Sequence, residues 1–172
     1  IYNPQHRAVH YNLMDLEWAG HDFVTGELTA VGNALRGGND TNEGLPFLML
    51  GGEGDLAYFG RDNIAVDRHG DALPMFGRYT TGRARLIEAE RPLMPLDGIE
   101  VLPADLVERH VLSHGGARPW DRSAEETRIL FFIAEGRGDV IDDESEVSTY
   151  PSVAEPTRAP FVEAEWNLDT ME

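Results

Sequence analysis

The chain has 172 residues, no cysteine and a formal net charge of −17 at pH 7. This length suits one domain, and the lack of cysteine excludes disulfides, thiolate catalysis and cysteine-ligated metal sites. Nucleic acids and anionic lipid surfaces are bound by clustered cations, so the negative charge argues against both as direct partners.

The first part of the chain predicts an arm followed by a β domain. Residues 1–12 are polar and extended in character, and we expect an N-terminal arm there. The β domain is expected to cover residues 13–141. Within it, Phe23–Val31 fits one face of a strand, while Leu28 and Leu35 also have helical spacing with neighbouring apolar positions. The sequence leaves this element open between strand and helix.

Short apolar segments separated by turns rich in Gly and Pro predict most of the strands. They are Leu45–Leu50, Leu56–Phe59, Asn63–Val66, Phe76–Glu90, Ile99–Leu102 and Thr127–Glu135. The last contains a continuous apolar run, which predicts a strand buried on both faces. Strands at this spacing favour a mainly-β fold, and we predict a jelly-roll-like sandwich or barrel. The sequence shows no internal repeat.

One short helix is predicted at about residues 103–114. Pro103 suits the start of a helix, and Gly115 and Gly116 supply a stop. The apolar face between them is made by Leu106, Val107, His110 and Val111. Residues 142–172 are acidic at first and then contain prolines, which predicts a C-terminal arm. Phe161 and Trp166 are its large apolar side chains, and we expect them to anchor the arm in an assembly.

Three residues suggest a metal site. His69 and Asp71 form a His-x-Asp pair, and His114 follows at a distance, which is the pattern of a two-histidine, one-carboxylate facial triad for Fe(II). The segment from His114 to Phe132 resembles the distal-histidine segment of the Fe(II)/2-oxoglutarate oxygenases. That resemblance implies a jelly-roll fold, Fe(II) and 2-oxoglutarate as cofactors, and a role for Arg128 in binding the cosubstrate carboxylate. In the simpler interpretation, His69 and Asp71 are solvated turn residues and His114 stabilises a helix C-terminus.

The balance of charged residues indicates an environment of high salt. All 14 basic residues are arginine, against 31 acidic residues. This composition resembles that of haloarchaeal proteins. The layout, with a β domain between two arms, resembles that of single-jelly-roll capsid proteins.

These observations favour a structural subunit over an enzyme. We expect a component of a larger assembly, most simply a virion protein of the capsid, decoration or tail class, with other protein subunits as partners in a homo- or hetero-oligomer. On this hypothesis the chain has no catalytic residues and no cofactor. The alternatives are the metalloenzyme with His69, Asp71 and His114, and an accessory subunit of a cellular complex. No signal peptide and no run of the roughly 18 apolar residues of a membrane span are evident, so we expect the virion or the cytoplasm of a halophile.

The first prediction concerns salt. Because the surface carboxylates repel one another and concentrated salt screens them to within about 3 Å, we expect the thermal unfolding temperature to rise steeply from low to multimolar KCl. Circular dichroism melts across a KCl series measure this. A flat response would contradict adaptation to salt and leave codon usage as the reason for the absence of lysine.

Overall fold

The computed structural model describes residues 1–14, 24–79 and 81–146. It divides the chain into two compact units, Ile1–Asp139 and Val140–Glu172. The strands of the first unit are β1 (Val9–Leu13), β2 (Gly26–Val31), β3 (Ala34–Arg36), β4 (Leu48–Gly52), β5 (Leu56–Arg61), β6 (Ile64–Val66), β7 (Phe76–Arg78) and β8 (Leu86–Glu88). Its helices are α1 (Ala104–His114) and α2 (Ala124–Ala134), and the second unit contains the 3-10 helix η1 (Glu144–Glu146).

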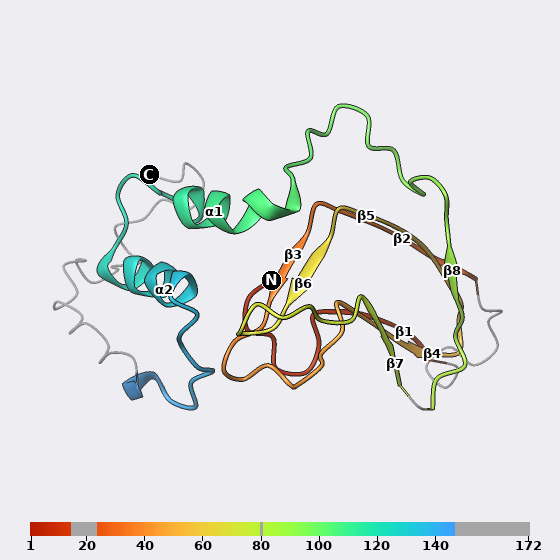
Figure 1. Cartoon of the computed structure of the whole chain (residues 1–172), viewed down its shortest axis with the longest axis horizontal. Helices are drawn as coiled ribbons and strands as arrows, with labels where there is room; N and C mark the ends of the chain where they lie inside the picture. The colour runs from red at the N-terminus through yellow and green to blue at the C-terminus, as the bar shows by residue number, and fades with distance from the viewer. Residues whose placement is uncertain (15–23, 80, 147–172) are drawn as a thin grey trace, which may run out of the picture. The chain divides into compact units, whose positions relative to one another are not determined.

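The strands form three sheets that the chain visits in turn. Their orders are β1-β4-β7, β2-β5-β8 and β3-β6, and the neighbouring strands in each sheet pair in parallel. Each circuit of the chain therefore adds one strand to each sheet, as in a β-solenoid. The first coil is β1, β2 and β3, the second is β4, β5 and β6, and the third contains β7 and β8. Figure 1 shows the paired strands of successive coils side by side.

Successive coils repeat the same turn. Asn33 and Asn63 are 30 residues apart and follow β2 and β5 respectively. The side-chain amide of Asn33 donates to the side-chain oxygen Oδ1 of Asn63 at 2.8 Å. The residues before them, Gly32 and Asp62, both have positive φ angles, of 66° and 52°. This left-handed conformation is rare for a residue with a side chain other than Asn or Asp. The expectation of no internal repeat is therefore wrong, because the repeat lies in backbone conformation more than in residue identity.

The core lies inside the coils. Its largest fully buried side chains are Leu35, Phe47, Leu48 and Leu56. Burial of a large apolar side chain contributes roughly 1.5–3 kcal/mol. Because alternate residues of a strand point to opposite faces, a strand of three residues such as β3 sends only Leu35 into this interior, whereas the longer β5 contributes Leu56 and Tyr58.

The third coil is incomplete. After β8, the described residues contain no strand that pairs with β6 and extends the β3-β6 sheet. Instead, the backbone N–H of Leu93 donates to the Thr29 hydroxyl at 3.0 Å, and that of Ala104 donates to the Asp62 carboxylate at 3.0 Å. The segment between β8 and α1 therefore returns to the turn after β5, and Asp62 binds the first N–H of α1.

The mainly-β class is confirmed, whereas the jelly roll is not. Parallel pairing in all three sheets is not typical of a jelly roll, which is built from antiparallel Greek keys. The strands predicted at Leu56–Phe59 and Asn63–Val66 correspond to β5 and β6, and the open element Phe23–Val31 contains a strand, β2. The helix predicted at 103–114 is α1.

The strand predicted at Thr127–Glu135 is wrong, because these residues belong to helix α2 and its C-terminal cap. The reason is at its N-terminus. The Ser123 hydroxyl accepts from the Glu126 N–H, and the Glu126 carboxylate accepts from the Ser123 N–H, which is a capping box. The helix that begins at this capping box continues through the apolar run. By periodicity alone, a continuous apolar run of this length fits a buried strand as well as a buried helix.

Two other predicted strands also differ. Phe76–Glu90 is divided between β7 and β8, which belong to different sheets. Ile99–Leu102 is irregular, because it packs on a turn: a Cβ at Gly32 would lie 2.6 Å from both the Leu102 carbonyl oxygen and the Val101 side chain. The segment 1–12 contributes β1 and a bridge between Tyr2 and Arg36 to the first unit.

Across the ranges 1–14, 24–79 and 81–146, no helix has the length and hydropathy needed to cross a bilayer.

The second prediction tests the repeated turn. Asn63 accepts from both the backbone N–H and the side chain of Asn33, and it donates to the Ala30 carbonyl at 2.8 Å. Asn63→Ala leaves these partners unsatisfied and should lower the free energy of unfolding by about 2–3 kcal/mol. Asn42→Ala is the control, because the Asn42 side chain bonds only the exposed ring of His6, and it should cost about 0.5 kcal/mol or less. Equal losses in chemical denaturation would contradict the role of Asn63.

Candidate functional site

His69 and Asp71 lie in the turn that follows β6. The carboxylate of Asp67 organises this turn by accepting the backbone N–H groups of His69 and Asp71 at 2.8 and 2.9 Å. These bonds, that from Asp71 first, hold the pKa of Asp67 below its usual range. Both side chains of the His-x-Asp pair are exposed, and the His69 ring accepts from the Arg68 guanidinium at 3.0 Å. The turn that contains His69 and Asp71 is therefore stabilised by Asp67, which the metal hypothesis does not use.

His114 is the last residue of α1. Its ring stacks on that of His110 with 4.5 Å between centroids, and its Nδ1 lies 3.1 Å from the His110 carbonyl oxygen. Both rings are exposed on one helix face. A histidine at this position interacts favourably with the helix C-terminus when it is protonated.

The predicted triad is not assembled in this structure. Among the residues that the structure describes, no three His, Asp or Glu side chains are grouped so that they could hold a metal ion. Arg128, which the oxygenase resemblance assigns to a cosubstrate, is instead paired with Glu125 at 2.8 Å and lies over the Phe132 ring. His69, Asp71 and His114 therefore do not form a three-residue ligand set as they lie in this structure.

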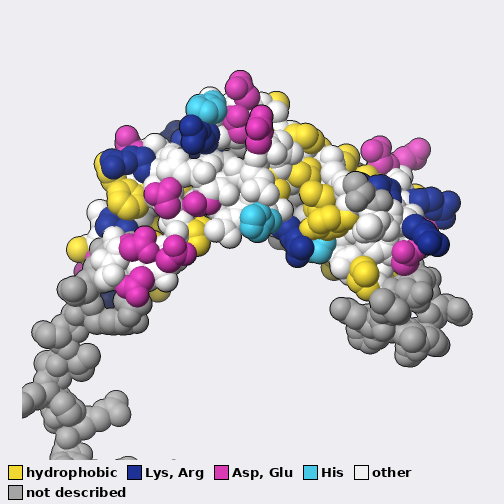
Figure 2. All heavy atoms as spheres, turned by 90° about the horizontal axis from the view of Figure 1, so that it is seen from below, with side chains coloured by type: hydrophobic (Ala, Val, Ile, Leu, Met, Phe, Trp, Pro, Cys, Tyr) yellow, Lys and Arg dark blue, Asp and Glu magenta, His cyan; other side chains and the backbone are white. Residues whose placement is uncertain are grey.

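The predicted C-terminal arm belongs to the second unit, and most of it lies outside the residues that the structure describes. In the acidic segment, the Glu146 carboxylate accepts the backbone N–H groups of Asp142 and Asp143, each at 2.9 Å. Glu146 therefore supports the local backbone. The predicted anchors Phe161 and Trp166 lie outside the described residues. On the face shown in Figure 2, acidic side chains lie at several separate places, as expected of a solvated acidic surface.

Arg36, at the end of β3, joins the coils to both helices. Its guanidinium donates to the Glu108 carboxylate of α1 at 2.6 Å and to the Ile133 carbonyl of α2 at 3.3 Å. Its side chain is 27% exposed. A cation at a helix C-terminus is favourable because of the helix dipole. Sequence reasoning missed this residue, since nothing about an arginine after a short strand indicates two partners 72 and 97 residues away.

The two helices expose large apolar side chains. We use the term helix surface for the exposed apolar side chains of this region, which lie on more than one side of the helices: Leu106 and Val111 of α1, Ile129 and Phe131 of α2, and Trp120 between them. Their exposed fractions lie between 42% and 81%. No residue of α2 is buried, and Ala104 is the only buried residue of α1. Figure 1 shows the helices beside the β3-β6 sheet, where Arg36 holds them.

His10 of β1 is a further partly buried group. Its ring packs edge-on against Tyr79 at 5.5 Å, and Arg7 lies over the same tyrosine. Burial, and secondarily Arg7, lowers the pKa of His10. The Nε2 atom of His10 is buried and has no hydrogen-bond partner. These contacts favour a neutral imidazole that packs as part of the sheet.

Comparison with protein-family models, curated proteins and solved structures finds no match for this chain. Any functional assignment therefore depends on the residues described above. The sequence-predicted metal residues remain apart, whereas the helix surface is an apolar feature that the fold itself leaves exposed.

The third prediction tests the position of Arg36. Arg36→Gln removes a charged contact to α1 and a bond to α2, so we expect a loss of about 1–3 kcal/mol in unfolding free energy. Arg128→Gln is a matched control, because Arg128 has a similar exposure of 29% and also pairs with a glutamate. That pair is local to α2, and its loss should cost about 0.3–0.5 kcal/mol. Urea denaturation measures both losses, and an Arg36 effect no larger than that of Arg128 would disprove its joining role.

Proposed function

We propose that this chain is a structural subunit that associates with further copies of itself through the helix surface, in an environment of high salt. The observation that carries the proposal is the exposure of Ile129 and Phe131, at 49% and 50%, on a helix in which no residue is fully buried. A virion of a salt-adapted host is one assembly of this kind.

The helices need a partner for energetic reasons. Isolated helices shorter than about 12–15 residues are marginal in water, and most of their stability in proteins comes from packing an apolar face. Both α1 and α2 have 11 residues. The capping box at Ser123 and the Arg36 contacts support α2 from its ends, but its apolar residues Leu130, Phe132 and Ile133 are only half-buried. Packing against another molecule would supply the missing burial.

A second copy of the chain is the occupant that these features support. An apolar helix pair can pack on its symmetry mate, because a two-fold interface uses the same surface twice. The net charge of −17 opposes such association in dilute salt. Concentrated salt screens that repulsion and strengthens apolar burial when the anion is kosmotropic. Self-association should therefore increase with salt concentration. Association between oppositely charged surfaces would instead weaken, because salt screens their attraction.

The fourth prediction is measured by sedimentation in a series of KCl concentrations. We expect dimers or larger species in multimolar KCl, and a shift to monomers in Phe131→Ser and Ile129→Ser. At about 25 cal/mol per Å² of apolar burial, losing one large side chain from an interface weakens association by roughly 1–3 kcal/mol. Ile99→Ser is the control, because Ile99 is 60% exposed but lies outside the helices.

Three outcomes would overturn the proposal. The first is a monomer at every salt concentration at which circular dichroism shows the folded chain. The second is oligomerisation that appears only when residues 147–172 are removed, since the C-terminal segment of the same molecule would then be the natural occupant of the helix surface. The third concerns the control variant. Association that Ile99→Ser weakens as much as Phe131→Ser would assign the interface elsewhere.

A further inference from the structure

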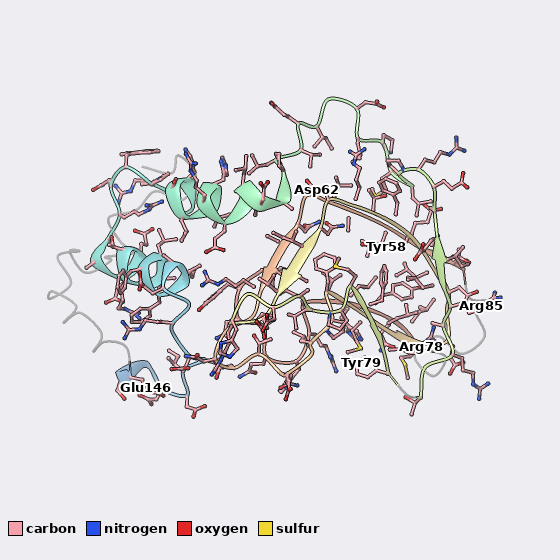
Figure 3. The ribbon with its side chains drawn as sticks, viewed as in Figure 1. Tyr58, Asp62, Arg78, Tyr79, Arg85 and Glu146 are labelled. Atoms are coloured by element: carbon pink, nitrogen blue, oxygen red, sulfur yellow. The ribbon has the colours of Figure 1, made fainter. Side chains whose placement is uncertain are left out.

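Two histidines lie about one helical turn apart on α1. The helix begins beside Asp62, which is labelled in Figure 3 and binds its first N–H, and His110 and His114 belong to its C-terminal half. Residues four apart on a helix lie on the same face, with about 5–6 Å between their Cβ atoms. Both side chains are exposed, and both line a cavity of about 290 Å³. The helix therefore presents two imidazoles to the same space.

The two rings already lie close to one another. Their centroids are 4.5 Å apart and the angle between their planes is 24°. Two nitrogens bound to one metal ion lie at most about 4 Å apart, because each metal–nitrogen bond is about 2.0–2.1 Å long. The separation of the centroids is near this limit, so a small rotation of each ring about its Cβ–Cγ bond turns a nitrogen of each toward a shared ion.

The backbone determines which nitrogen of His114 is free. Its Nδ1 atom lies 3.1 Å from the His110 carbonyl oxygen, and a carbonyl only accepts, so Nδ1 carries the proton. In the neutral ring the lone pair then belongs to Nε2. Histidines that ligate metal ions donate the other ring N–H to a carbonyl or carboxylate in this way, which fixes the ring and raises the basicity of the ligand atom.

The other lining residues limit the kind of ion that fits. Leu102 and Leu106 are apolar, and the positive charge of Arg109 opposes a bound cation. Affinity must therefore come from bonds to the ring nitrogens. Within the described parts of the chain, no third His, Asp or Glu side chain completes the group. Hard cations such as Ca²⁺ need several oxygen ligands, so they do not fit this pair.

We propose that His110 and His114 form a two-histidine site for a divalent transition-metal ion, with Cu²⁺ bound most tightly. Imidazole suits Cu²⁺, Zn²⁺ and Ni²⁺, and affinity along the divalent ions of this series is greatest at Cu²⁺. Nε2 of His114 and a ring nitrogen of His110 bind the ion, and water fills its other positions. Neither histidine belongs to the helix surface, so this site stands or fails independently of self-association.

The fifth prediction uses Cu²⁺ itself as the probe. Because the chain has 31 acidic residues, the titration contains excess Mg²⁺, which occupies carboxylates and does not compete for imidazole. Isothermal titration calorimetry of the full chain should show one Cu²⁺ per chain, and electron paramagnetic resonance of the bound ion should show two nitrogen ligands. His110→Gln and His114→Gln should each weaken binding about a hundredfold or more, because a second linked ligand adds roughly 10²–10⁴ in affinity. Each variant should leave a single nitrogen ligand.

His6→Gln and His10→Gln are matched controls. These two histidines are also four residues apart, but they do not lie on a helix. The ring of His6 lies 3.0 Å from the Asn42 side chain, and the Nε2 atom of His10 is buried in β1. Both variants should keep the affinity for Cu²⁺ and the two nitrogen ligands of the wild type. Circular dichroism establishes that each variant is folded.

The proposal is overturned if the folded wild-type chain binds no Cu²⁺ in excess Mg²⁺. It is also overturned if His110→Gln and His114→Gln weaken binding no more than His6→Gln, because the ion would then be held elsewhere, such as at the N-terminal amine. A single nitrogen ligand in the wild-type complex would show that the two rings do not share the ion, and would equally disprove the site.

Discussion

The hydrogen bonds between Asn33 and Asn63 are the constraint on which the arrangement of the coils depends. They hold two turns, 30 residues apart, at the same corner, and Asn63 also binds the Ala30 carbonyl. With the corner fixed, β2 and β5 enter it in register, from Gly26 beside Leu56 to Val31 beside Arg61, and β3 and β6 leave it in register. The corner also determines where α1 begins, because Asp62, the residue before Asn63, binds the first N–H of that helix. A register error at this point would turn every side chain of the paired strands to the opposite face.

The sequence predicts local elements better than their pairing. Alternating and apolar segments mark β5 and β6, and Pro103 with Gly115 marks α1, because these signals depend on neighbouring residues. Parallel pairing depends on partners about 30 residues away, for which a single pair of asparagines is a weak signal. The error at α2 is different, since Ser123 and Glu126 form a recognisable capping box before the apolar run. The three candidate metal residues could not be tested by spacing, because whether distant residues meet depends on the topology.

The acidic composition and the helix surface act in opposite directions. Fourteen arginines against 31 acidic residues give a surface that keeps molecules apart in dilute solution. The side chains of Ile129, Phe131 and Trp120 remain exposed all the same. Scattered exposed apolar residues are normal, but a helix whose apolar residues are at most half-buried lacks part of the contribution that usually stabilises it. The proposed self-association removes this conflict by coupling contact between helices to the screening of charge.

The open end of the coils is an unsuitable place for the same association. Glu88 continues the inward column that contains Leu28 and Tyr58 in the two preceding coils. Stacking another coil on this end would bury the Glu88 carboxylate in an apolar interior, which is costly unless a partner charge accompanies it. An inward-pointing charge of this kind protects a sheet edge against pairing with another chain.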